Sequence, residues 1–122
     1  MTRIASLASR LSVLLLLAAP ALAAPAPAVE PAAEFVQLCI DQLDLDTQQS
    51  SGLRSYLEQE IEFMAVQRAN HTAAEVAELL PAQREELQRV AGRLMSPSQL
   101  RRFRELEATP QMKDYLRQMN LE

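Results

Sequence analysis

The chain has 122 residues, of which 48% are hydrophobic and only 4% aromatic, and its formal net charge is −4. This length suffices for one domain. The acidic balance and the lack of a strongly basic face exclude nucleic-acid binding by electrostatics, and the scarcity of aromatic residues excludes a base-stacking platform.

The N-terminal 23 residues have the three regions of a secretory signal peptide. Two Arg make the start basic, Leu11–Ala19 is a short apolar run, and Ala21–Ala23 matches the small-x-small cleavage pattern. The alternative is a membrane anchor, but a run of nine residues is far shorter than the roughly 20 that a spanning helix needs. We expect cleavage near Ala23, a periplasmic or secreted protein, and no stable membrane anchor.

The chain that cleavage would leave has 10 basic and 16 acidic side chains and a net charge of −6. The charge is uneven, with −8 over residues 24–83 and +2 over residues 84–122. Residues 24–31 (APAPAVEP) alternate Pro with Ala and have no apolar periodicity. We therefore expect an extended tether over residues 24–31, followed by a single domain over residues 32–122.

The sequence of this domain predicts four helix starts, each at a capping residue. Three of them have Gln or Glu three residues after the cap, the spacing of a capping box: Asp46/Gln49, Thr72/Glu75 and Ser96/Gln99. The fourth, Thr109, is followed by Pro, which is favoured at the first helical position. No segment alternates with the period of a strand. The domain is therefore expected to be all-α, a small bundle or helical hairpin of about five helices.

Apolar periodicity sets the expected bounds of these helices. The first is expected from about Ala32 to Leu43, and the second from Asp46 to about Ala69. Apolar side chains of the second helix fall within an arc of about 160° at 100° per residue: Leu53, Tyr56, Leu57, Ile61, Phe63 and Met64. The residues before and after Pro81 keep one stripe, which predicts two nearly collinear helices or one kinked helix rather than a reversal.

Glu60 lies within the apolar arc of the second helix. Burying a carboxylate there without a partner would destabilise the fold by several kcal/mol. Two explanations are open. Glu60 pairs with an Arg from the run Arg84–Arg104, or this face lines an open groove in which the carboxylate stays hydrated. We prefer the open groove, because Gln67 and Arg68 continue on the same side and would be hard to bury together.

The chain has one Cys and one His, so it can form neither an internal disulfide nor a Cys/His metal cluster. Cys39 lies on the first helix and is expected to be buried; an intermolecular disulfide and a reactive thiol are the alternatives. A Cys39–His71 nucleophile pair would span two predicted elements and has no orienting third residue. Since a Gly-rich phosphate loop is also missing from the sequence, we expect neither an enzyme nor a cofactor.

Two segments, Leu43–Gln49 (LDLDTQQ) and Met95–Gln99 (MSPSQ), resemble the paired LTxxQ motifs of the Spy/CpxP family. Asp46 stands where the family has Thr in the first copy, and Met and Ser replace Leu and Thr in the second. Leu100–Leu106, after the second copy, is also similar to that family. The resemblance implies a small, helical, bacterial periplasmic protein linked to envelope stress and chaperone activity.

A second resemblance covers Met95–Leu116, which can be aligned without gaps to the C-terminal signature of a secreted proteobacterial family of unknown function. That signature has a capped helix, an aromatic pair, then Ser-Pro-x-Gly-x-Lys and a Leu. The matching residues here are Thr109, Pro110, Lys113 and Leu116. Both resemblances imply an exported helical domain without an active site.

These features favour an exported, non-enzymatic helical protein that binds polypeptide through an apolar, Met-containing face, with a chaperone-like or envelope-stress role. The candidate polypeptide-binding face comprises Leu57, Glu60, Ile61, Met64, Met95 and Phe103. Ordinary core packing is the competing explanation for the Met residues. The alternative function is a structural or adaptor protein that docks onto one fixed envelope partner or self-associates as a homodimer.

Overall fold

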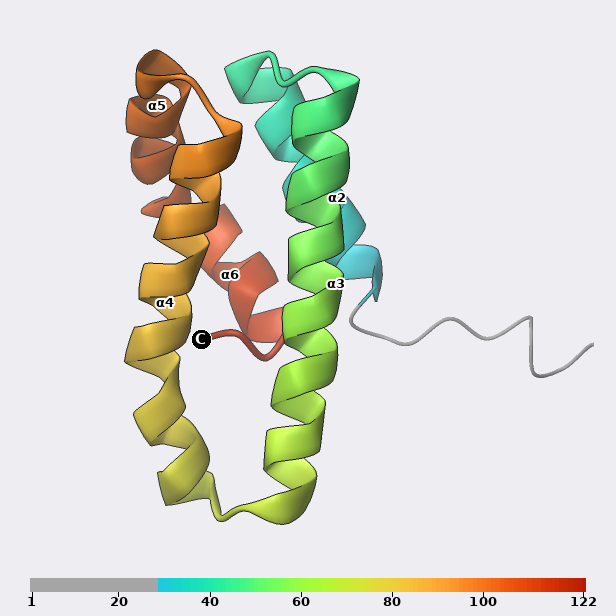
Figure 1. Ribbon diagram of the computed structural model, residues 1–122, viewed down its shortest axis with the longest axis vertical. Helices are drawn as coiled ribbons and strands as arrows, with labels where there is room; N and C mark the ends of the chain where they lie inside the picture. Colours follow the sequence, from blue (N-terminus) through green and yellow to red (C-terminus); the bar gives the residue numbers. More distant parts are fainter. Residues whose placement is uncertain (1–28) are drawn as a thin grey trace, which may run out of the picture.

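The structure, a computed structural model, describes residues 29–122. These residues form five α-helices and no strand, which confirms the all-α prediction (Figure 1): α2 (Val29–Leu43), α3 (Thr47–Asn70), α4 (Ala73–Leu94), α5 (Pro97–Glu107) and α6 (Pro110–Gln118). None of these five helices has both the length and the apolar character needed to cross a membrane. The predicted signal peptide, residues 1–23, and residues 24–28 of the predicted tether lie outside the described residues.

Helix α2 begins at Val29, three residues before the predicted start at Ala32. The tether prediction is therefore wrong for residues 29–31. Pro31 does not break the helix, because a proline in the first turn lacks only an N–H that would have no intrahelical partner. Pro31 and Ala32 are both buried, so packing also holds this first turn in place.

The four predicted caps are confirmed. The Asp46 carboxylate accepts a hydrogen bond from the backbone N–H of Gln49 at 2.7 Å, and Gln49 Oε1 accepts one from the N–H of Asp46 at 3.0 Å. Thr72 with Glu75 and Ser96 with Gln99 form the same reciprocal pair of bonds. Thr109 caps α6 through the N–H of Met112. Each cap satisfies N–H groups that a helix start leaves without a partner.

The two longest helices, α3 and α4, run antiparallel as a hairpin joined by His71 and Thr72 (Figure 1). Helix α4 continues through Pro81 as one helix, which confirms the predicted continuity across this residue. Pro81 is exposed, so water can reach the carbonyl that loses its backbone donor there. The end of the hairpin nearest the His71–Thr72 turn projects beyond the other three helices (Figure 1).

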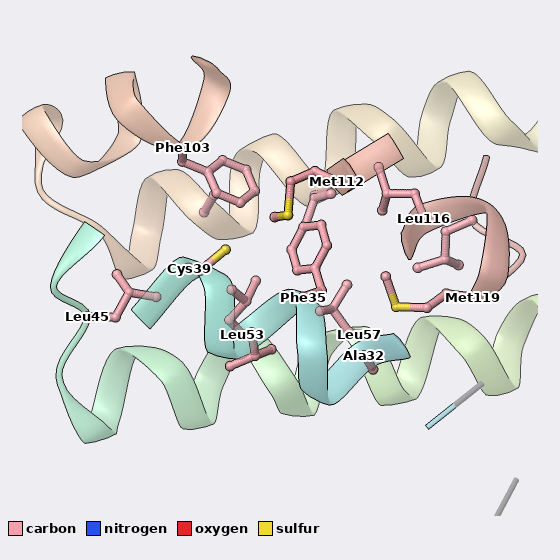
Figure 2. Packing of buried hydrophobic residues seen from close by; sticks show 14 of the residues in the cluster. Ala32, Phe35, Cys39, Leu45, Leu53, Leu57, Phe103, Met112, Leu116 and Met119 are labelled. Carbon is pink, nitrogen blue, oxygen red and sulfur yellow. The ribbon is translucent and has the colours of Figure 1, made fainter. Parts of the chain in front are cut away.

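The other three helices cover one side of the hairpin, and α2 contacts α3, α5 and α6. Phe35 of α2 and Phe103 of α5 pack edge to face, with ring centroids 6.3 Å apart and 72° between the ring planes. Buried side chains from all five helices surround them, including six that Figure 2 labels: Cys39, Leu53, Leu57, Met112, Leu116 and Met119. Burial of each large apolar side chain contributes about 1.5–3 kcal/mol, so this cluster provides most of the stability.

The side chains of Gln49 and Gln99 hydrogen-bond to each other and join the α2–α3 turn to the α4–α5 turn. Gln49 Nε2 donates to Gln99 Oε1 at 2.8 Å and to the Leu94 carbonyl at 2.9 Å. In return, Gln99 Nε2 donates to the Leu43 carbonyl at 3.2 Å. The two LTxxQ-like segments thus meet in space, and we call the Gln49–Gln99 pair the glutamine clasp.

Candidate functional site

The six residues of the predicted binding face do not form one open surface. Leu57, Met64 and Phe103 are fully buried. Met95 is 7% exposed. These four residues therefore belong to the hydrophobic core, and they do not form the accessible face that the sequence predicted. Glu60 and Ile61 are half-buried. An apolar stripe shows which side of a helix faces other elements, but not that those elements cover it completely.

A pocket of about 630 Å³ lies between the α3–α4 hairpin, α5 and α6, and two residues of the predicted face, Leu57 and Glu60, line it. The pocket forms because the backbone of α6 approaches α2 and α5 but not α3 or α4. Leucines from α3, α4, α6 and the C-terminal segment make its apolar walls: Leu57, Leu87, Leu116 and Leu121. Its volume lies within the range of about 300–1,000 Å³ that is typical of small-ligand sites.

Three buried side-chain atoms have no hydrogen-bond partner within residues 29–122, and all three belong to residues that line this pocket. They are Tyr56 Oη and Glu60 Oε2 on α3, and Gln83 Oε1 on α4. Tyr56 and Glu60 are four residues apart and so lie on the same face of α3, one turn from each other. Buried polar atoms are nearly always paired, so three unpaired ones on residues that line one pocket mark it as a candidate binding site.

Burial raises the pKa of Glu60 above its ordinary value of 4.5, and the nearby charge of Glu86 raises it further. Glu86 is itself bound by Arg89 at 2.7 Å. Glu60 takes part in none of the ion pairs of residues 29–122, so the predicted pairing with an Arg of the run Arg84–Arg104 is not formed. The open-groove alternative is met only in part, because Glu60 lines the pocket but one of its carboxylate oxygens, Oε2, is buried.

A second polar group of the pocket is built around Glu107 of α5. Gln88 Nε2 donates to Glu107 Oε1 at 2.6 Å, and Arg104 Nε donates to Gln88 Oε1 at 3.4 Å. Burial raises the pKa of Glu107; the Gln88 hydrogen bond opposes this effect, and the charge of Glu122 adds to it. Arg84, Arg104 and Lys113 are exposed residues of the pocket lining. The pocket thus combines apolar walls with charged groups of both signs.

The structure does not bring Cys39 and His71 together as a nucleophile pair. Cys39 is fully buried, which confirms that prediction, while His71 is exposed on the turn between α3 and α4. Burial, and then the charge of Glu107, raise the pKa of Cys39 to about 12, so its thiol is almost fully protonated at neutral pH. Among residues 29–122, no three His, Cys, Asp or Glu side chains are grouped closely enough to hold a metal ion.

Two large apolar side chains on the outer part of α3 are exposed, Phe63 by 41% and Val66 by 56%. Phe63 was placed in the apolar arc from the sequence, but it lies at the edge of that arc and faces solvent. A smaller hollow of about 300 Å³ lies near the hairpin turn and is lined by residues that include Arg68, His71, Val76 and Leu80.

Sequence reasoning missed Gln83 and Glu107 as members of the site. Gln83 carried a usable signal, because it interrupts the α4 stripe between Leu80 and Leu87 as Glu60 interrupts the stripe of α3. Glu107 carried no such signal. Its place in the pocket depends on how α5 packs against α4, which follows from contacts between residues far apart in the sequence.

No family model, curated protein or solved structure matches the chain. The geometry of the pocket, the exposed pair on α3 and the motif resemblances are therefore the grounds on which a function is proposed.

Proposed function

We propose that this protein is an exported, non-enzymatic helical protein that binds segments of other polypeptides, in a chaperone-like or envelope-stress role. The observation that carries the proposal is the pocket between the α3–α4 hairpin and α6, with its leucine walls and three unpaired polar atoms. The resemblance of the two clasped segments to LTxxQ motifs supports the same function. The proposed binding site is thus the pocket, and not the apolar, Met-containing face expected from the sequence.

A polypeptide segment suits this lining for a physical reason. Its apolar side chains can pack against leucines such as Leu87 and Leu116, while its N–H groups supply donors to the unpaired oxygens of Glu60 and Gln83. A purely apolar ligand would leave those oxygens unpaired, and leaving a buried acceptor unpaired costs about 1–3 kcal/mol. The pocket therefore favours a ligand that is apolar in part and carries hydrogen-bond donors.

The test is suppression of aggregation. The purified protein should reduce light scattering from two unrelated denatured proteins at stoichiometric ratios. Ala108 lines the pocket at an exposed position, so Ala108→Trp should fill the site without entering the core and should abolish the effect. Ala82→Trp is the matched control, because Ala82 is exposed on α4 and outside the pocket lining. Equal activity of the two variants would contradict the proposed site.

Export is tested separately. Intact-mass analysis of protein from the envelope fraction should show a chain that begins at Ala24 or within one or two residues of it, as the signal-peptide prediction requires. Recovery of the full-length chain from the cytoplasm would contradict it.

The second candidate function is an adaptor that docks onto one partner or onto a second copy of itself. The observation that favours it is the exposed pair Phe63 and Val66 on α3. Sedimentation velocity across a hundredfold concentration range should then show a dimer that Phe63→Ser/Val66→Ser disrupts. A monomer at all concentrations, combined with aggregation suppression, would leave only the first candidate.

A further inference from the structure

We propose that the pocket selects an aliphatic cation, an ammonium or guanidinium group on an aliphatic stem, and that Glu60 is the residue that recognises its charge. The inference rests on the proposed function, since a Lys or Arg side chain of a bound polypeptide presents this chemistry. A free aliphatic amine presents the same chemistry, and the experiment below distinguishes the two sources.

The charge of Glu60 is uncompensated within the described residues. Its Oε2 atom is buried without a hydrogen-bond partner, and no basic side chain of residues 29–122 lies within ion-pair distance of it. Glu86 is the acid whose charge raises the pKa of Glu60, and it is already bound by Arg89. A partly buried carboxylate without a partner binds a positively charged donor more strongly than a neutral one, because both charge and hydrogen bond are supplied together.

The site also has two further unpaired acceptors. Gln83 Oε1 can only accept a hydrogen bond, and Tyr56 Oη can accept or donate one. With Glu60 Oε2, this makes three unpaired oxygens on residues that line one pocket. An ammonium group offers three N–H donors and a guanidinium offers five, and neither has an acceptor that would be left unpaired. A neutral alcohol has a single O–H donor, and an anion without N–H or O–H groups has no donor for the oxygens of Glu60 and Gln83.

The apolar walls of the pocket suit an aliphatic stem that carries the charge. Leu57, Leu87 and Leu116 line the same pocket as Glu60 and offer an apolar path beside it. Lys and Arg bury their methylene stems against apolar surface of this kind and place the charged head in a polar environment. The lining as a whole contains four carboxylates and three basic side chains, so it does not repel a cation.

The experiment is a titration of the isotope-labelled protein at pH 7 and low ionic strength, followed by two-dimensional NMR. Three probes are used: Nα-acetyl-lysine amide, its neutral counterpart Nα-acetyl-norleucine amide, and 1,5-diaminopentane. We expect the lysine probe to shift the resonances of Tyr56, Glu60 and Gln83 saturably, with an affinity at least tenfold higher than that of the norleucine probe. Binding of the diamine but not of the lysine probe would identify a free amine as the ligand.

A matched pair of variants tests the role of Glu60. Glu60→Gln keeps the shape of the side chain and removes its charge, so it should reduce the affinity for the lysine probe at least tenfold and leave the norleucine probe unaffected. Glu62→Gln changes the net charge by the same amount at an exposed position outside the pocket, and it should bind as the wild type does. Circular dichroism confirms that both variants are folded.

Each remaining outcome overturns the inference. Equal affinity for the lysine and norleucine probes would reject cation selection but leave polypeptide binding intact. Saturable lysine binding that Glu60→Gln does not weaken would place the cation elsewhere. No shift with any probe at millimolar concentration would reject the pocket as a cation site, while aggregation suppression by the wild type would still support the proposed function through another surface.

Discussion

Glu60 carries a negative charge on a face of α3 where its neighbours Leu57 and Met64 are fully buried. No basic side chain among residues 29–122 pairs with it, and the Glu86 charge disfavours its ionised form further. A residue that served only the fold would be apolar or paired at this position. The unpaired carboxylate thus supports the proposed binding role.

We predict that Glu60→Gln does not destabilise the protein at pH 7. Because burial and Glu86 raise the pKa of Glu60, the folded state disfavours its ionised form, and removal of the charge should raise the free energy of unfolding. The gain should be below about 1 kcal/mol, since Glu60 is only half-buried and solvent screens its charge. Urea denaturation measures it. A loss above 1 kcal/mol would reveal a hidden cationic partner.

The same residue predicts a dependence on pH. A carboxyl with a raised pKa in the folded state binds its proton more tightly there than in the unfolded chain, so this group's contribution makes the folded state more stable as pH falls toward 4.5. The stability advantage of Glu60→Gln over the wild type should consequently be largest at pH 7 and shrink near pH 5. Denaturation of both proteins at the two pH values checks this. A constant difference would mean that Glu60 is not desolvated.

At the scale of the helices, the capping residues do more than end individual elements. Gln49 and Gln99 each accept the N–H of their own cap and donate to the opposite turn. One amide thus satisfies two helix ends, since its oxygen and its NH2 group point to different partners. The helix caps and the long-range clasp are built from the same two side chains.

We predict that the clasp couples these two residues energetically. In a double-mutant cycle, Gln49→Ala and Gln99→Ala should show an interaction free energy of about 0.5–1.5 kcal/mol. Either substitution alone removes the hydrogen bond between the two side chains, so the second substitution has no such bond left to remove. Glu75→Ala provides the control, since Glu75 hydrogen-bonds to its own cap residue, Thr72, rather than to another turn. Its effect should add to that of Gln99→Ala. Additivity in the Gln49/Gln99 pair would contradict the clasp.

The elements that sequence reasoning placed correctly depend on local chemistry. Asp46, Thr72, Ser96 and Thr109 each determine a helix start through residues within one turn, and all four starts are where the pattern predicted. The contacts between elements are different. The sequence showed that Glu60 interrupts a stripe. How far other elements cover that stripe depends on contacts between residues far apart in the sequence, which no local pattern encodes.

Over the whole molecule, the core is unevenly distributed. Of the buried apolar residues, only Met64 and Val76 fall between residues 58 and 86, and the rest gather where α2, α5 and α6 pack against the hairpin. The projecting end of the hairpin therefore depends on helix propensity and two-helix packing, and it is the part most able to open. The sequence predicted two long helices here but not that their outer ends would lack a covering layer.

Because Cys39 is completely buried, the rate at which its thiol is labelled reports how often the folded chain opens. A thiol reagent can reach it only during a transient opening of the core around Phe35 and Phe103, and the attacking species, the thiolate, is nearly absent in the folded state. Labelling in native buffer should be slower than in 6 M urea by several orders of magnitude and should accelerate with each increment of denaturant. When opening and closing are fast compared with labelling, the ratio of the two rates reports the open population. In an oxidising compartment, the same burial would prevent the folded protein from forming an intermolecular disulfide. A disulfide-linked dimer would therefore show that the chain had unfolded before the two thiols reacted.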